Sequence, residues 1–124
     1  MKDSKILVVE DDSFLLQMYA TKLETEEFKV FTASTGSEAL SLVEKEDLDL
    51  ILLDLNLPEV DGFNVLEELK SNPKTKHIPV LVLTNFSQKE DIDRCLDLGA
   101  EDFLIKAHFV PSEVIEKIKK ILKK

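Results

Sequence analysis

The sequence is poor in cysteine, histidine and glycine, and the shortage of cysteine excludes a disulfide-stabilised fold. Among the 124 residues there are one cysteine, two histidines and three glycines. Because Cys95 is alone, no disulfide can form within the chain, and an unpaired thiol is typical of a reducing compartment, so we expect a cytoplasmic location. Cys95 follows Ile92 at helical spacing, and we expect a small buried apolar side chain, not a reactive thiol.

Long apolar runs and an excess of basic residues are also absent. No apolar run reaches about 18 residues, the minimum for a membrane-spanning helix, and the N-terminus lacks the apolar stretch of a signal peptide. We therefore expect no membrane association. With 25 acidic and 16 basic residues the net charge is −9, which argues against direct binding of nucleic acid, since such binding needs clustered Lys and Arg. Five basic residues fall in positions 117–124, where we expect a solvated helix face.

Five short apolar runs, rich in β-branched side chains, are too short for helices and predict strands. Three of the runs are apolar at every position, which is typical of strands that are buried on both faces of a parallel sheet. The runs are Ile6–Val9, Val30–Phe31 with its neighbours, Leu50–Leu53, Val80–Leu83 and Phe103–Ile105.

Each run is followed by residues at the i, i+3, i+4 spacing of an amphipathic helix. The segments 35–38 and 87–90 fit the capping box of a helix start, Asp61 can cap the third helix, and Gly99 suits a left-handed stop after the fourth. The strand–helix unit therefore occurs five times. This alternation predicts one α/β domain over residues 1–124, a doubly wound five-stranded parallel sheet in the order 2-1-3-4-5.

Charged and hydroxyl residues follow four of the five predicted strands. Glu10 and Asp11 follow the first strand, Asp54 the third, Thr84 the fourth and Lys106 the fifth. The second strand, which the predicted order places at an edge, ends in Ala33 and Ser34, with no charged residue that could take part in the chemistry. Because ligands of doubly wound sheets bind beyond the carboxyl ends of the strands, we expect these five side chains to surround one crevice.

The three acids in this set predict a metal site. Glu10, Asp11 and Asp54 would bring three negative charges together, and without compensation one carboxyl should take up a proton. Carboxylate oxygens select hard cations, so we expect Mg²⁺, with Ca²⁺ or Mn²⁺ as alternatives, and not zinc. A divalent ion and Lys106 would neutralise the three acids, so that the site could tolerate an anionic phosphoryl group.

Asp54 is a suitable nucleophile in such a site. An aspartate is ionised at neutral pH and needs no general base to activate it, so the site can work without a histidine. Phosphoryl transfer mainly requires position and charge neutralisation, which the metal, Lys106 and the Thr84 hydroxyl would supply. The product, an acyl phosphate, is reactive and transient, which suits a switch.

Four sequence motifs resemble those of the receiver domain of two-component response regulators. They are Val8-Val-Glu-Asp-Asp12, Leu53-Asp-Leu-Asn-Leu-Pro-Glu-Val-Asp-Gly62, Leu83-Thr84 and Phe103-Leu-Ile-Lys106, and the resemblance extends over residues 5–122. It implies the flavodoxin-like receiver fold and a phosphorylation-activated signalling switch. A sensor histidine kinase or a histidine phosphotransfer protein would be the phosphodonor, and no separate substrate would be turned over.

The resemblance also implies a role for each matching residue. Asp54 would be the phosphoacceptor, and Thr84 and Lys106 would contact the phosphoryl oxygens. Phe103 would be the switch aromatic that is coupled to Thr84, and the surface formed by the fourth helix, fifth strand and fifth helix would signal to a protein target. The implied metal site consists of Asp11 and Asp54 as direct ligands, the backbone carbonyl of Asn56 as a third, and Glu10 acting through water.

The chain departs from the family pattern at three positions. Glu10 stands where Asp is common, and Phe103 stands where Tyr is also common, so it has no hydroxyl for a surface hydrogen bond. Ala107 follows Lys106 where Pro is usual. Since a cis bond before a non-proline residue costs about 2.5–4 kcal/mol, we expect a trans Lys106–Ala107 bond. Phe86, two residues after Thr84, is expected to shield the acyl phosphate from water.

Three rival functions are less consistent with these residues. A magnesium phosphatase with an Asp nucleophile usually has a second Asp two residues later, where this chain has Asn56. A nucleotide- or flavin-binding module would need a glycine-rich first loop, but residues 10–13 read Glu-Asp-Asp-Ser. A receiver that had lost its chemistry and only binds partners would not need the full set of acids, Thr84 and Lys106. If the chain is complete, we expect a stand-alone receiver like the chemotaxis regulators; if excised, an output domain is missing.

Overall fold

The computed structural model describes residues 3–57, 61–85, 89–106 and 110–123. These residues form strands and helices in strict alternation. The strands are β1 (Lys5–Val9), β2 (Lys29–Ala33), β3 (Leu50–Asp54), β4 (Val80–Thr84) and β5 (Asp102–Ile105). The helices are α1 (Ser13–Thr25), α2 (Gly36–Lys45), α3 (Gly62–Ser71), α4 (Lys89–Asp97) and α5 (Pro111–Lys123).

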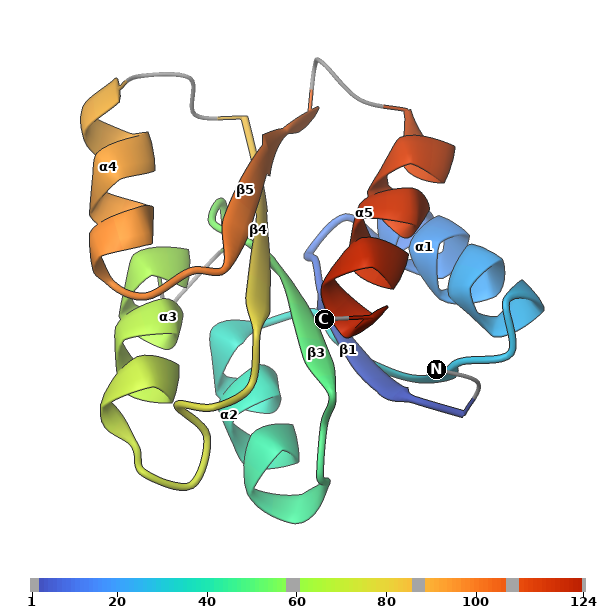
Figure 1. Ribbon diagram of the computed structural model, residues 1–124, viewed down its shortest axis with the longest axis horizontal. Coiled ribbons are helices and arrows are strands. Elements are labelled where there is room, and N and C mark those ends of the chain that lie inside the picture. The colour runs from blue at the N-terminus through green and yellow to red at the C-terminus, as the bar shows by residue number, and fades with distance from the viewer. Residues whose placement is uncertain (1–2, 58–60, 86–88, 107–109, 124) are drawn as a thin grey trace.

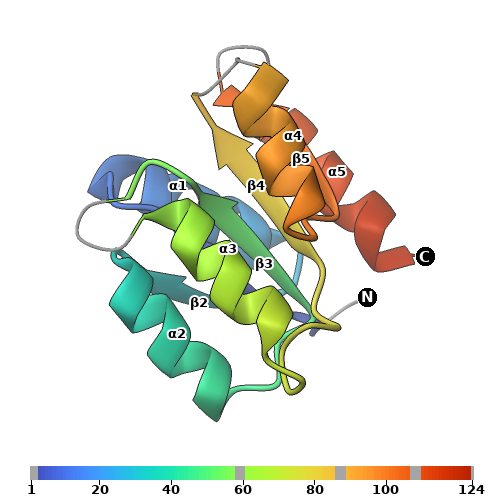
Figure 2. The same cartoon turned by 90° about the vertical axis from the view of Figure 1, so that its left-hand side faces the viewer.

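The strands form one parallel sheet in the order β2-β1-β3-β4-β5, so the predicted strand order is confirmed (Figure 1). Helices α1 and α5 cover one face of the sheet, and α2, α3 and α4 cover the other, as Figures 1 and 2 show. This arrangement is the doubly wound α/β fold that the alternation of elements predicts. A helix connects each strand to the next one in the chain, as parallel strands require.

The period-two alternation of strand side chains divides the interior into two cores. Ile6 and Val8 of β1 and Leu52 of β3 belong to the core under α1 and α5, which also contains Ile118 of α5. Leu7, Val9, Ile51 and Leu53 belong to the core under α2, α3 and α4. Since both faces of β1, β3 and β4 are covered, these strands are apolar at nearly every position, as the sequence indicates. Burying each such side chain contributes about 1.5–3 kcal/mol.

The helix starts follow the predicted signals with one correction. Asp61 caps α3, since its Oδ1 accepts a hydrogen bond from the Phe63 backbone N–H at 2.8 Å. Thr35 caps α2 by accepting from the Glu38 N–H at 3.1 Å. The other half of the predicted capping box, in which the Glu38 carboxylate would accept a hydrogen bond from the Thr35 backbone N–H, is wrong. The Glu38 carboxylate accepts instead from the Ser34 hydroxyl at 2.7 Å and from the Ser34 N–H. The other capping segment, 87–90, begins outside the described residues.

The end of α4 also agrees with its predicted signal. Gly99 has a φ of +108°, in the left-handed region that a side chain disfavours. The Ala100 N–H returns to the Cys95 carbonyl at 3.1 Å, which closes the last turn. Cys95 itself is buried, as expected. Burial is the main cause that raises the pKa of its thiol to about 11, and the negative charge of the nearby Asp102 is the second.

The described helices include none that is both long and apolar enough to cross a membrane.

Candidate metal and nucleophile site

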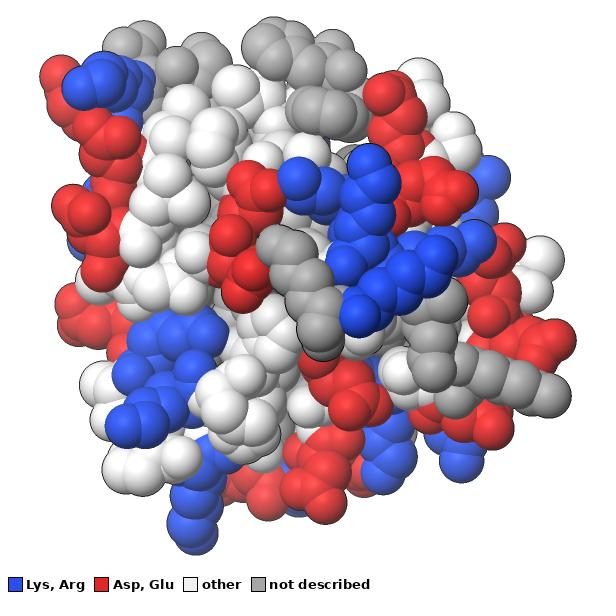
Figure 3. All heavy atoms as spheres, in the orientation of Figure 1, with Lys and Arg blue, Asp and Glu red and all other residues white. Residues whose placement is uncertain are grey.

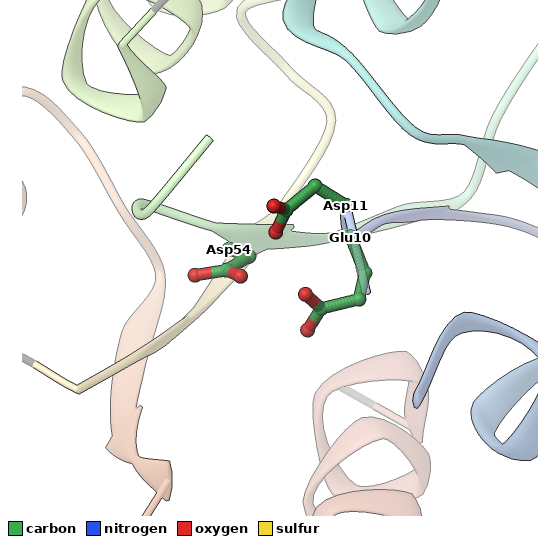
Figure 4. Close-up of side chains that lie close together, drawn as sticks. All are labelled: Glu10, Asp11 and Asp54. Atoms are coloured by element: carbon green, nitrogen blue, oxygen red, sulfur yellow. The ribbon is translucent and has the colours of Figure 1, made fainter. Parts of the chain in front are cut away.

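Three acidic side chains meet at the carboxyl ends of β1 and β3 (Figure 4). Glu10, Asp11 and Asp54 each offer a carboxylate oxygen, and these oxygens all lie within 4.8 Å of one another. Glu10 and Asp54 are only 2% exposed, whereas Asp11 is exposed. The structure therefore brings together the three acids from which a metal site was predicted.

The strand register explains why these acids are neighbours. Val9 of β1 pairs with Leu53 of β3, so the residues that follow, Glu10 and Asp54, come side by side at the same edge of the sheet. Asp12 is nearby in sequence but has a different role. Its Oδ1 accepts hydrogen bonds from the Phe14 and Leu15 N–H groups at 2.9 and 3.1 Å and caps α1.

Lys106 reaches this cluster from the end of β5. Its Nζ lies 2.9 Å from Asp54 Oδ2 and 3.0 Å from Glu10 Oε1. The lysine side chain is 17% exposed and both carboxylate partners are nearly fully buried. Lys106 is thus directed at the predicted nucleophile, as expected, while the Lys106–Ala107 bond and its expected trans geometry lie outside the described residues.

The pKa values of Glu10 and Lys106 shift as this arrangement requires. Burial raises the pKa of Glu10, and the hydrogen bond and negative charge of Asp54 raise it further, against the opposing effect of Lys106. This is the direction expected when carboxylates crowd together. Burial alone would lower the pKa of Lys106, but its hydrogen bonds to Asp54 and Glu10 and the charges of both acids outweigh burial and raise it.

The Asp54 carboxylate is held at both oxygens. Oδ1 accepts a hydrogen bond from the Asn56 backbone N–H at 2.9 Å, and Oδ2 contacts Lys106. The Asn56 side-chain oxygen in turn lies 3.5 Å from the Asn85 backbone nitrogen, which joins the segments that follow β3 and β4. Because both oxygens have a partner, the orientation of Asp54 is defined by its surroundings.

Gly62 allows the segment after β3 to fold back against the strand end. Its N–H donates to the Leu55 carbonyl at 3.3 Å. A Cβ atom at this position would lie 2.8 Å from the Leu55 carbonyl oxygen and 2.9 Å from the Asp54 carbonyl oxygen, and nearer still to the Leu55 Cα. Only a glycine fits so close to the backbone that carries Asp54. Pro58 and the rest of 58–60 lie outside the described residues.

Thr84 lies on β4, the strand beside Asp54, and Phe103 lies on β5, the next strand along the sheet. Thr84, 2% exposed, ends β4 one residue beyond Leu83, the register partner of Asp54. Phe103 is half-buried and packs against the core under α2, α3 and α4. Thr84 lies at the carboxyl end of β4, as expected, whereas Phe103 is the second residue of β5 and pairs with Val82 in the middle of β4. The coupling of Thr84 and Phe103 remains a prediction. Phe86 lies outside the described residues.

The donor set fits a magnesium ion. Three carboxylates against one ammonium leave two negative charges when all four groups are ionised, and a divalent cation matches them. All ligand atoms are oxygens, as Mg²⁺ prefers. By contrast, a hollow of about 1060 Å³ lies at the opposite edge of the sheet, between 43–49 and 72–79. We locate the chemistry at the acids and not in this hollow, because no residue at the carboxyl ends of the strands lines the hollow.

Sequence reasoning missed two features of the site. It did not identify Asp12 as the cap of α1, although an acid just before a helical run is a recognised start signal. It also gave Glu10 only a metal contact through water, whereas the structure pairs Glu10 directly with Lys106. No local pattern could reveal that pair, because its two residues are 96 positions apart.

Comparisons with known proteins agree with this geometry. Residues 6–119 match the family model described as response regulator receiver domain. The chain is 38% identical over 122 residues to the regulatory protein VanRc of Enterococcus gallinarum, covering 97% of this chain and 50% of that protein. It is 39% identical over 121 residues to the cell cycle response regulator CtrA of Brucella ovis, with 97% and 50% coverage. The chain thus spans about half the length of these curated relatives.

A solved structure shows the same similarity in three dimensions. A CheY-like response regulator receiver domain protein from Methanospirillum hungatei superposes with a TM-score of 0.89 at 30% identity. The match covers 97% of this chain and 94% of that chain.

Proposed function

The chain belongs to the response regulator receiver domain family of two-component systems, and on that premise we propose that Asp54 accepts a phosphoryl group in a magnesium-dependent reaction that switches the domain between two states. The observation that carries this proposal is the convergence of Asp54 with Glu10, Asp11 and Lys106 at one edge of the sheet.

In the proposed reaction a carboxylate oxygen of Asp54 attacks the phosphorus of the donor. A new O–P bond forms as the bond from phosphorus to the leaving group breaks, and the leaving group departs with its electron pair. The leaving group is an imidazole when the donor is a phosphohistidine of a sensor histidine kinase or of a histidine phosphotransfer protein. Asp54 needs no base, since a carboxylate already carries the attacking electron pair.

The surrounding residues would orient and neutralise the reactants. The Lys106 ammonium, 2.9 Å from Asp54 Oδ2, would bind an oxygen of the incoming phosphoryl group, and the Thr84 hydroxyl would bind another. Asp11, Asp54 and the Asn56 carbonyl would hold the magnesium ion directly, and Glu10 would hold it through water. Mn²⁺ could take the place of Mg²⁺ at this site. When bound, the ion would supply positive charge that offsets the phosphoryl oxygens.

The signalling output is proposed to involve Thr84 and Phe103. Drawing the Thr84 hydroxyl toward a phosphoryl oxygen would open space beside β5, and the half-buried Phe103 ring could move into it. The surface of α4, β5 and α5 would then present a different shape to a protein target. A phosphatase with an Asp nucleophile usually has a second Asp two residues later, and this chain has Asn56 at that position. Asn56 therefore supports a switch that turns over no separate substrate.

The proposed partners are proteins, and not nucleic acid. Figure 3 shows basic side chains gathered over α5 with acidic side chains around them. Lys117 lies 2.6 Å from Asp102, and Lys119 pairs with Glu26, so these cations already have acidic neighbours. We also propose a cytoplasmic location, because the chain has a single cysteine, Cys95, as is usual in a reducing compartment.

The proposal is tested by incubating the protein with magnesium and acetyl phosphate and measuring its intact mass. We expect a gain of one phosphoryl group that disappears with a chelator and in Asp54→Asn. Asp12→Asn is the matched control, since asparagine also caps a helix and the variant removes an acid beside the site; it should still gain the group. A gain that persists in Asp54→Asn would exclude Asp54 as the acceptor.

A further inference from the structure

The Glu10 carboxylate makes two directed contacts that a role in metal binding does not require. Oε1 lies 3.0 Å from Lys106 Nζ, and Oε2 accepts a hydrogen bond from the Asp12 backbone N–H at 3.2 Å. The side chain is 3% exposed, so its position is set by the protein and not by solvent. Glu10 is therefore anchored at one oxygen by its own loop and holds Lys106 with the other.

Lys106 needs such a contact because it crosses a long distance to Asp54. It follows β5, which is separated from β3 by β4. A lysine is a point charge on a flexible stem that can adopt many rotamers. Asp54 Oδ2 is one contact, and a single contact leaves the ammonium free to swing around it. Glu10, which extends from the end of β1 beyond Asp54, supplies the second.

We propose that Glu10 is a positioning residue that holds the Lys106 ammonium against Asp54, in addition to its place in the acidic cluster. The inference rests on the proposed function for its consequence, namely that Lys106 is aimed for phosphoryl transfer. The contact itself is independent of that function.

The length of the Glu10 side chain is the feature that makes the contact possible. An aspartate at this position would be shorter by one carbon–carbon bond of about 1.5 Å, and this would take its carboxylate from 3.0 Å to beyond the usual hydrogen-bonding range of about 3.2 Å. A glutamine would keep both the reach and an acceptor oxygen but lose the charge. Glu10→Asp and Glu10→Gln therefore separate reach from charge.

The first test observes the Lys106 ammonium in protein labelled with ¹⁵N-lysine and prepared without magnesium. An ammonium held by two carboxylates exchanges its protons slowly with water and gives a detectable ¹H–¹⁵N signal, which Lys106→Met would identify by its loss. We expect Glu10→Gln to retain the signal. We expect Glu10→Asp to lose it or to exchange about tenfold faster, the effect of one charged hydrogen bond.

The matched control is Asp11→Asn, which alters the acidic cluster at a residue adjacent to Glu10. Asp11→Asn should leave the Lys106 signal as in the wild type. A Glu10→Asp protein whose Lys106 signal and exchange rate equal those of the wild type would overturn the proposal. A Glu10→Gln protein that loses the signal to the same extent as Glu10→Asp would support positioning by Glu10 and assign it to the charge of the side chain as well as to its length.

The second test measures the rate of phosphorylation by acetyl phosphate at saturating magnesium. Glu10→Asp should be slower by about tenfold or more, and Glu10→Gln should be slowed less. An unchanged rate in Glu10→Asp would show that Glu10 does not aim Lys106 for the reaction. If the wild type accepted no phosphoryl group, the proposed function would fail, while the ammonium signal would still decide whether Glu10 positions Lys106.

Discussion

The close approach of Gly62 to the backbone of Asp54 and Leu55 leads to a quantitative prediction for Gly62→Ala. The new Cβ would overlap two carbonyl oxygens, at 2.8 and 2.9 Å, and the Leu55 Cα. None of these atoms can rotate away, so the segment after β3 must move. Overpacking of this kind costs about 1–3 kcal/mol. The better helix propensity of alanine returns at most about 1 kcal/mol, and it returns less in the first turn, so the overlap wins.

Because three backbone atoms overlap the new Cβ, we take the upper end of the overpacking range, about 3 kcal/mol, and less about 1 kcal/mol for helix propensity the net loss is about 2 kcal/mol. This loss can be expressed as a change in melting temperature. An unfolding entropy of about 2.1 cal/mol/K per residue over 124 residues gives a shift of about 4 °C for each kcal/mol. Gly62→Ala should therefore melt about 8 °C below the wild type in a thermal scan followed by circular dichroism. Because the displaced backbone carries Asp54, phosphorylation by acetyl phosphate should also be slower.

Gly99→Ala is the matched control. It forces alanine into a φ of +108°, a strain of about 1–3 kcal/mol, at the end of α4. Its Cβ would meet the flexible Lys70 side chain at 3.0 Å, so Gly99→Ala should melt lower but be phosphorylated at the wild-type rate. The reasoning is refuted if Gly62→Ala melts and reacts like the wild type. Equal slowing in both variants would attribute the effect to stability alone.

Three further predictions follow from the described contacts. Magnesium at a hundredfold above its Kd should stabilise the protein by about 2.7 kcal/mol, which raises the melting temperature by about 10 °C with the same unfolding entropy. In a thermal scan Asp11→Ala should lose most of this increase. Asp12→Ala should melt at a lower temperature without magnesium but keep the increase. The Cys95 thiol should react with a disulfide reagent at pH 8 far more slowly in the folded than in the denatured protein. Because its folded pKa is raised to about 11 from 9.0, its contribution to stability should be complete below pH 9 and be lost as the pH rises through about 11; fast reaction with the folded protein would contradict the burial. Asp61→Ala should lower the unfolding free energy in urea by about 1 kcal/mol by removing the α3 cap, and Asp61→Ser should restore most of it.

Much of the site could be predicted because it depends on strand ends. Glu10, Asp54, Thr84 and Lys106 each follow an apolar run, and the carboxyl ends of parallel strands meet at one edge. Once alternation of strands and helices established a parallel sheet, these residues had to be neighbours. The same local logic predicted the cap at Asp61 and the left-handed turn at Gly99, since each depends on a few adjacent residues.

The partners of individual side chains could not be predicted in this way. Glu38 has the residue type and position of a capping box, yet it bonds to Ser34. Two nearby groups compete for the same carboxylate, and their relative placement depends on how the chain enters α2 from β2. Sequence spacing contains no such information.

The sequence by itself determined the alternation of elements, the identity of the buried strands and the set of charged residues at the strand ends, because hydrophobic burial and local capping act through periodicity and neighbours. The tertiary structure alone decided which acid does what. Asp11 stays exposed, and Glu10 is buried with Lys106. The physical reason is that hydrogen-bond geometry is sensitive to shifts of less than 1 Å, and such shifts are set by packing among strands that are far apart in the chain.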